Sequence, residues 1–159
     1  MSWDKTGDPR ILKRWYGHME VEEYVYPAGL AGEIFLKNLK EKGVLTGSCC
    51  EKCGVTYMPA RAFCECCFSK IEKYVECEPK GYVKSYTIVY IDKDGNKLEK
   101  PEIIALIHIP GAKGGIIHRL GEVEPEDVCI NMEVEAVLKP KEQREGSITD
   151  ILYFKPTTK

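Results

Sequence analysis

The chain has 159 residues, of which 43% are hydrophobic and 30% charged, and its formal net charge at pH 7 is −2. These values predict one or two small globular domains. No apolar run approaches the ~20 residues that a membrane-spanning helix needs. The opening sequence MSWDKTGDPR lacks the apolar stretch of a secretory leader, so we expect a cytoplasmic protein with reduced cysteines.

Residues 1–45 are predicted to be a helical segment that forms a hairpin. Asp8 and Pro9 are suited to begin a helix over Pro9–His18, because Asp caps helices well and Pro fits their first turn. A second helix is expected over Ala28–Lys42, ending at Gly43. Val21–Pro27, between the two helices, is expected to be extended.

The second predicted helix carries an apolar stripe of four side chains, Leu30, Ile34, Phe35 and Leu39. The stripe could pack on the rest of this chain, or it could dock on another protein. Amphipathicity shows that a face is buried without showing which surface buries it. Both interpretations stay open, and the four residues are our candidates for partner binding.

Four cysteines form two pairs with the spacing of metal ligands: Cys50 with Cys53, and Cys64 with Cys67. Two residues between thiolates let one tight turn present both sulfurs to one ion, and two such turns complete a tetrahedron. Gly54 follows the first pair, and glycine readily adopts the positive φ that such a turn needs. The spacing predicts a structural zinc site over residues 46–78, with short strands at Val55–Pro59 and Ile71–Cys77.

Disulfides, rubredoxin-type iron and a redox dithiol are the alternatives to zinc. The absence of a leader argues against disulfides, and the ten-residue gap between the pairs favours a zinc ribbon over iron. Cys49 and Cys66 are interpreted as bystanders, because either would break the two-residue spacing. Cys77 and Cys129 are expected to be small buried hydrophobic residues. A closed four-sulfur site leaves no position for substrate or water.

Residues 79–159 are rich in β-forming sequence and are expected to form one domain. Asp92–Asn96 reads as a hairpin turn rather than a calcium loop, since no Glu stands at the loop end. Five strands suit a small closed barrel of the OB type, with a five-stranded sandwich as the alternative. The predicted strands are Tyr82–Tyr90, Ile103–Ile109, Ile116–Leu120, Met132–Leu138 and Ile148–Phe154.

The distribution of charge argues against nucleic acid as the partner. The ribbon segment 46–77 is neutral, and residues 80–138 carry seven basic and ten acidic side chains, a net charge of −3. Binding to a phosphate backbone needs clustered positive charge. A nucleic-acid-binding ribbon and OB module is therefore kept only as an alternative function.

The ordered motifs resemble the DUF35 family of acyl-CoA-associated proteins, which pair a rubredoxin-like zinc ribbon with an OB-fold. The resemblance covers most of the chain, and Asn131 stands where the family often has glycine. The matching residues are Cys50, Cys53, Gly54, Pro59, Arg61, Cys64 and Cys67 in the ribbon, then Gly81, Val83, Ser85, Tyr86, Thr87, Ile104–Ile107, Gly115–Leu120, Met132, Val134 and Ala136.

The resemblance implies a partner rather than a reaction. Proteins similar to this one are scaffolds or small subunits of thiolase-superfamily enzymes. Examples are acetoacetyl-CoA thiolase with hydroxymethylglutaryl-CoA synthase, benzoylsuccinyl-CoA thiolase and phloroglucinol acyltransferases. The ribbon and OB-fold are thought to help hold CoA or its thioester. We therefore expect a non-catalytic accessory subunit with a structural Zn²⁺, a thiolase-type partner and a CoA site shared with that partner.

The chain offers no convincing catalytic set of its own. His108 lies in an apolar strand and His18 near a helix end, while Cys129 has an acidic neighbourhood that disfavours a thiolate. A stand-alone CoA-thioester enzyme is a second alternative. CoA phosphates call for basic side chains, and our candidates around the Gly-rich loop and the ribbon are Lys113, His118, Arg119 and Arg61.

Overall fold

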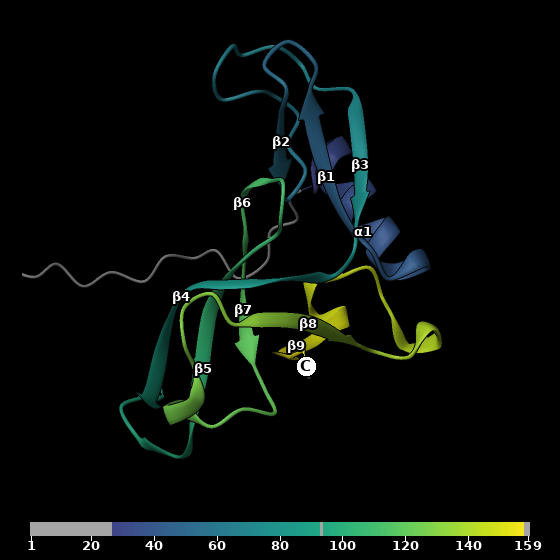
Figure 1. Cartoon of the computed structure of the whole chain (residues 1–159). Helices are drawn as coiled ribbons and strands as arrows, with labels where there is room; N and C mark the ends of the chain where they lie inside the picture. The colour runs from purple at the N-terminus through teal and green to yellow at the C-terminus, as the bar shows by residue number, and fades with distance from the viewer. Residues whose placement is uncertain (1–26, 93, 158–159) are drawn as a thin grey trace, which may run out of the picture.

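The computed structural model describes residues 27–92 and 94–157, drawn in colour in Figure 1. The helix predicted over Pro9–His18 and nearly all of the predicted extended segment Val21–Pro27 lie outside the described residues. Within the described ranges, no helix has both the length and the apolar character needed to cross a membrane.

One α-helix opens the described part of the chain. α1 covers Gly29–Lys42, one residue from the predicted start, and ends at Gly43, whose N–H bonds to the carbonyls of Asn38 and Leu39. The described part thus has a single N-terminal helix where the sequence predicted a helical hairpin.

The zinc-ribbon segment forms a small sheet with the strand order β3-β1-β2-β6. The strands are β1 (Leu45–Cys50), β2 (Val55–Met58), β3 (Lys73–Cys77) and β6 (Lys113–Gly114). β2 and β3 agree with prediction, whereas β1 was not predicted as a strand. β6 comes from the barrel part of the sequence and pairs in parallel with β2, with Tyr57 opposite Lys113 and Met58 opposite Gly114. In Figure 1 the β6 loop rises from the barrel to reach β2.

Five strands close into a barrel in the order β4-β5-β7-β9-β8, which confirms the predicted OB-type architecture. They are β4 (Lys80–Ile91), β5 (Lys97–His108), β7 (Ile116–Leu120), β8 (Glu133–Leu138) and β9 (Ile151–Pro156). Short 3₁₀ turns cover Pro125–Asp127, Lys141–Gln143 and Ile148–Asp150. The last turn occupies the predicted start of the final strand. Asp92 accepts hydrogen bonds from the backbone N–H groups of Asp94 and Asn96, as expected for a hairpin turn.

The barrel closes weakly between β7 and β9. These strands run parallel and pair at Leu120 and Phe154, where Gly121 N–H also donates to the Phe154 carbonyl at 2.8 Å. Toward Ile117 and Leu152 the described strands share no further ladder pair. We call this stretch, where no ladder pair joins β7 and β9, the open edge of the barrel.

The helix, the ribbon and the barrel share one main hydrophobic core. Phe35 and Leu39 of α1 lie in it, together with Met58 of β2 and the barrel residues Ile107 and Phe154. For Phe35 and Leu39 this favours the first of the two open interpretations, packing on the rest of this chain, because its own sheet and barrel bury them.

The other two residues of the predicted docking stripe differ in their burial. Ile34 is half-buried, and Leu30 leaves 60% of its surface exposed. All four residues lie on one face of the helix by its period, but Leu30 is in the first turn of α1, which extends beyond the edge of the core. Leu30 is thus the member of the stripe that is free to meet another protein.

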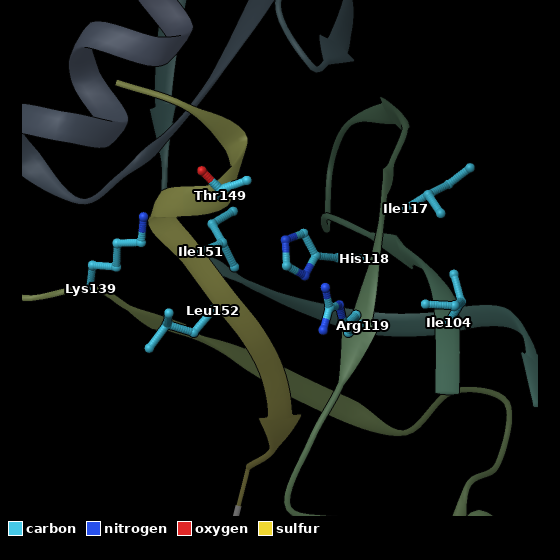
Figure 2. A pocket seen from close by; sticks show the side chains of 8 residues that line it. All are labelled: Ile104, Ile117, His118, Arg119, Lys139, Thr149, Ile151 and Leu152. Atoms are coloured by element: carbon cyan, nitrogen blue, oxygen red, sulfur yellow. The ribbon is translucent and has the colours of Figure 1, made fainter. Parts of the chain in front are cut away.

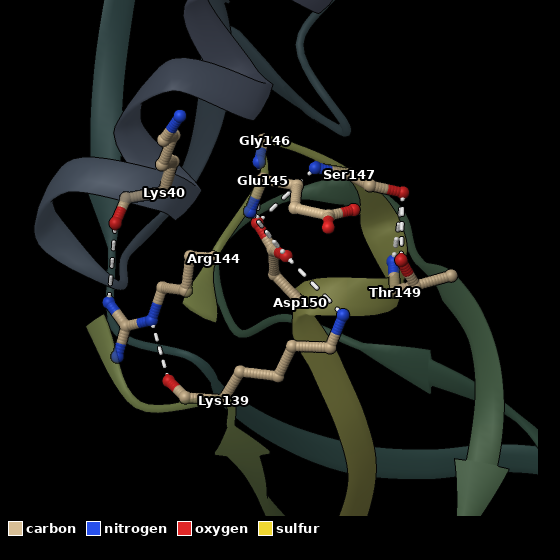
Figure 3. Close-up of polar contacts among 8 residues, drawn as sticks. All are labelled: Lys40, Lys139, Arg144, Glu145, Gly146, Ser147, Thr149 and Asp150. Carbon is tan, nitrogen blue, oxygen red and sulfur yellow. Dashed lines mark hydrogen bonds and ion pairs between the residues drawn. The ribbon is translucent and has the colours of Figure 1, made fainter. Parts of the chain in front are cut away.

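A buried carboxylate organises the loop that leads into β9 (Figure 3). Asp150 has no exposed surface, and its two oxygens accept backbone N–H bonds from Glu145, Gly146 and Ser147 at 2.8–3.2 Å. The Arg144 guanidinium in the same loop donates to the Lys139 carbonyl at 2.8 Å and lies 3.5 Å from the Lys40 carbonyl near the end of α1. The loop therefore braces the helix against the barrel.

Candidate metal centre and adjoining pockets

The four predicted ligands, Cys50, Cys53, Cys64 and Cys67, come together as one cluster. Their sulfur atoms all lie within 4.8 Å of one another. The Cys50 and Cys67 sulfurs are 3.6 Å apart, and those of Cys53 and Cys64 are 3.9 Å apart. A zinc tetrahedron with Zn–S bonds of about 2.3 Å requires S···S edges of about 3.8 Å, so the cluster fits Zn²⁺.

Two tight turns position these sulfurs. Gly54 follows the first pair with φ +66°, as predicted, and its N–H bonds to the Cys50 carbonyl at 2.8 Å. The second turn closes through Phe68 N–H to the Cys64 carbonyl at 2.9 Å. Cys50 and Cys64 are buried, so the metal centre is anchored from the inside of the ribbon.

Electrostatics within the cluster favour a bound cation. The Tyr57 hydroxyl, followed by the backbone N–H of Cys67, lowers the pKa of Cys64 to about 5. Hydrogen bonding to Cys67 and burial raise the pKa of Cys53 to about 12. Adjacent thiolates repel one another, and a divalent ion removes this conflict by coordinating all of them.

Tyr57 is the main residue of the centre that the sequence interpretation missed. It is fully buried, and its hydroxyl lies 3.3 Å from the Cys64 sulfur and 3.7 Å from that of Cys66. A donor to a ligating sulfur stabilises the thiolate and fixes its orientation. The alternation of β2 carried a signal, because Tyr57 lies on the same face as Val55, which packs beside the cluster.

The remaining cysteines divide into half-buried and exposed. Cys49 is half-buried on β1, and Cys77 is half-buried against the main core, close to its prediction. Cys129 is exposed, so its prediction as a buried residue is wrong. It follows the Pro125–Asp127 turn, where the chain lies at the surface. Cys66 is exposed beside the ligands.

Two of the predicted CoA-binding residues flank Tyr57 on its outer side. The Arg61 guanidinium lies 5.5 Å and the Lys113 ammonium 5.8 Å from the centre of the Tyr57 ring. Both pair with Glu65, with Lys113 at 3.0 Å. β2–β6 pairing brings Lys113 to this position, so a barrel residue contributes to the surroundings of the metal centre.

A pocket of about 500 Å³ opens where the ribbon meets the barrel. Its basic side chains are Arg61, Lys84 and Lys113, and Leu106 is among its apolar ones. His108 also borders it, with Nδ1 2.9 Å from the Gly114 carbonyl oxygen. The other lining residues are Met58, Pro59, Gly114 and Gly115. The pocket thus offers cations beside an apolar surface.

The other two predicted CoA-binding residues line a different pocket, of about 510 Å³, at the open edge between β7 and β9. Figure 2 shows His118 between the two strands, facing Ile151 across the gap. Its ring meets Phe154 edge-on at 5.8 Å, and burial lowers its pKa. Arg119 lines the same pocket. The structure therefore does not bring the four predicted CoA-binding residues into one site.

Models of two protein domains match the chain in sequence. The rubredoxin-like zinc ribbon domain of ChsH2 matches residues 38–72, and the C-terminal OB-fold domain of ChsH2 matches residues 74–139. A DUF35 domain-containing scaffold protein of Methanocaldococcus jannaschii is 34% identical over 124 residues, covering 76% of this chain and 86% of that protein. The chain belongs to the DUF35 family.

Further relatives agree with this assignment. A DUF35 domain-containing scaffold protein of Pyrococcus furiosus is 33% identical over 129 residues, which cover 79% of this chain and 92% of that protein. A crystal structure of a DUF35 protein of unknown function from Sulfolobus solfataricus matches with a TM-score of 0.61 and 42% identity, over 69% of this chain and 78% of that one.

The same fold occurs in an assembled enzyme. A chain of the Ltp2–ChsH2(DUF35) aldolase matches with a TM-score of 0.57 and 22% identity, over 82% of this chain and 98% of that one. At this identity the likeness concerns the fold alone. This fold is thus also found in a chain of an aldolase structure.

Proposed function

We propose that this DUF35 protein is a non-catalytic scaffold subunit that binds a thiolase-superfamily enzyme. The observation that carries the proposal is its similarity, over three quarters of its length, to DUF35 proteins named as scaffolds. The fold of the ChsH2-containing aldolase supports it further. The zinc centre supports a structural role, because four thiolates fill a tetrahedron and leave no site for substrate.

The first turn of α1 is the part of the predicted docking stripe that can take part in such an assembly. Leu30 is exposed beside a pocket of about 670 Å³ that Pro27 and Leu36 also line. Exposed apolar surface beside a pocket is one of the features that mark a protein interaction site. Leu30 is therefore our candidate contact on the helix.

We further propose that the ribbon–barrel pocket helps the partner hold CoA. Arg61, Lys84 and Lys113 present three positive charges and Glu65 a single negative one beside it. The CoA phosphates need such cations, and Leu106 offers an apolar surface to the nucleotide. His118 and Arg119 line the other pocket and are not included in this site.

Affinity purification from the native cells tests the scaffold proposal. The tagged chain should retain a thiolase-fold protein in a fixed ratio and about one zinc ion per chain. Leu30→Asp should reduce recovery of that partner, whereas Tyr90→Asp, an exposed residue on the β4–β5 hairpin, should not. A zinc-loaded chain recovered alone or with RNA would contradict the proposal.

The CoA proposal has its own test on the purified complex. Lys84→Glu should weaken CoA binding while the partner stays bound, and Lys97→Glu, outside the pocket, should leave both unchanged. Equal CoA affinity in the wild type and Lys84→Glu would remove this pocket from the CoA site without affecting the scaffold role.

A further inference from the structure

The open edge between β7 and β9 has the properties of a second ligand site. The pocket there is bounded by side chains of β7 on one side and by β9 with its preceding turn on the other (Figure 2). Among the described residues the two strands pair at Leu120 and Phe154, and the pocket lies beside the stretch where they do not pair.

The walls of this cleft are mainly aliphatic. Four branched side chains line it, and together they offer a hydrocarbon surface on both sides of the gap. Ile117 leaves 70% of its surface exposed and Leu152 leaves 44%, so part of this surface faces water. Covering it with a hydrocarbon chain would be favourable. The four residues are Ile104, Ile117, Ile151 and Leu152.

The charged side chains that line the cleft are positive. Of the eight described residues that line it, Arg119 and Lys139 are cationic, and none is acidic. Each has an acidic neighbour outside the lining: Glu102 lies 3.8 Å from Arg119 and Asp150 lies 3.9 Å from Lys139. Both separations exceed hydrogen-bonding distance, so the N–H groups of the two cations keep donors available.

The acid beside Lys139 has other hydrogen-bond partners. The carboxylate of Asp150 accepts three backbone N–H groups and is fully buried, and Lys139 acts on it through its charge at 3.9 Å rather than through a hydrogen bond. His118 adds a half-buried ring, and its Nδ1 atom has no hydrogen-bond partner among the described residues. Backbone groups of Arg119 and Ile148 lie near the ring, and Nδ1 is a hydrogen-bonding atom inside the cleft that a ligand can use.

We propose that this cleft binds a small amphipathic organic anion, a carboxylate joined to an aliphatic chain, with the carboxylate between Arg119 and Lys139 and the chain against Ile117 and Leu152. The charge of the rim selects the head group, and the aliphatic walls select the tail. A cleft of about 510 Å³ has room for a chain of roughly eight to ten carbons. The site is separate from the proposed CoA pocket and does not depend on the scaffold role.

Calorimetric titration of the full-length, zinc-loaded protein with sodium octanoate tests the proposal. We expect saturable binding with a Kd below about 1 mM. Acetate, which has the charge without the chain, and 1-octanol, which has the chain without the charge, should each bind at least about tenfold more weakly. Backbone amide signals of Ile117–Arg119 and Leu152 should shift with octanoate in the NMR spectrum.

Variants locate the binding on the protein. Arg119→Gln should weaken octanoate binding at least about tenfold, and Arg119→Gln with Lys139→Gln should weaken it more. Lys84→Gln, a matched change in the ribbon–barrel pocket, should leave the affinity unchanged. Circular dichroism verifies the fold of each variant. Absence of saturable binding, equal affinity for octanoate and octanol, or unchanged affinity in a folded Arg119→Gln variant would overturn the proposal.

Discussion

Replacing Asp150 with Asn is expected to destabilise the protein strongly, although it changes few atoms. The buried carboxylate accepts three backbone N–H groups, with Oδ1 serving Glu145 and Oδ2 serving Gly146 and Ser147. An asparagine keeps one acceptor oxygen and turns its NH₂ group toward N–H donors. At least one of these part-buried N–H groups is then left without an acceptor, and each such loss costs roughly 1–3 kcal/mol.

The expected loss of unfolding free energy is therefore about 2–4 kcal/mol, since the bonds to a charged acceptor are also weakened. For a chain of this size, that corresponds to a fall in Tm on the order of 5–15 °C. Urea unfolding followed by circular dichroism measures the difference. Glu142→Gln, which alters an exposed carboxylate in the same loop, is the matched control and should stay within about 0.5 kcal/mol of the wild type.

The same side chain predicts a pH dependence with a defined sign. Burial acts to raise the pKa of Asp150, but the N–H groups of Glu145, Gly146 and Ser147 outweigh it and lower the pKa below its ordinary value. A lowered folded-state pKa contributes stability that is present above the unfolded value, near ~3.9, and is lost as the pH falls through the folded value. The advantage of wild type over Asp150→Asn should shrink below about pH 4. A loss under 1 kcal/mol at pH 7, or a difference that stays constant into strong acid, would refute this reasoning.

Three further predictions concern the ribbon and its attachment. Tyr57→Phe removes the donor to Cys64 and should lower zinc affinity roughly 10–100-fold in a chelator competition, with Tyr90→Phe unchanged. Gly114→Ala places a Cβ 2.3 Å from the Met58 carbonyl oxygen at φ +102° and should cost about 2–4 kcal/mol. Gly95→Ala, at φ +88° with open space around it, should cost only about 1 kcal/mol in the same denaturation assay. Removal of zinc by a chelator should unfold the ribbon sheet and be seen as lost amide protection in β1 and β2, whereas retained protection would contradict a structural role for the metal.

The parts of the fold that depend on local sequence were predictable. Ligand spacing within two tight turns identified the four cysteines, and strand-forming sequence identified the five barrel strands. Asn131, which stands where the family often has glycine, indeed has the left-handed backbone with φ 68°. The ligand spacing and the strand composition are local signals, and the expectation for Asn131 came from the family resemblance, so no knowledge of distant contacts was needed.

The parts that depend on distant contacts were not predictable. The pairing of Tyr57 with Lys113 joins residues far apart in sequence, and the two residues of β6 are too few to show a strand pattern. The stripe of α1 indicated a buried face, but its burying surface was decided by the barrel. His118 and Arg119 were predicted to bind CoA together with Lys113. The extended chain of β7 instead carries them away from the loop to another pocket.

The ladder between β2 and β6 also restrains how the two lobes can move. The covalent connection between β3 and β4 is only Glu78–Pro79, and such a short linker by itself would allow the ribbon to rotate relative to the barrel. Pairing of Tyr57 and Met58 with Lys113 and Gly114 adds a second point of attachment, and two points remove free rotation about the linker. The ribbon and the barrel are thus presented at one fixed spacing and angle. A protein that contacts both the ribbon and the barrel meets a surface of fixed geometry. Its binding does not have to stop rotation of the ribbon relative to the barrel, so no entropy is lost from that motion.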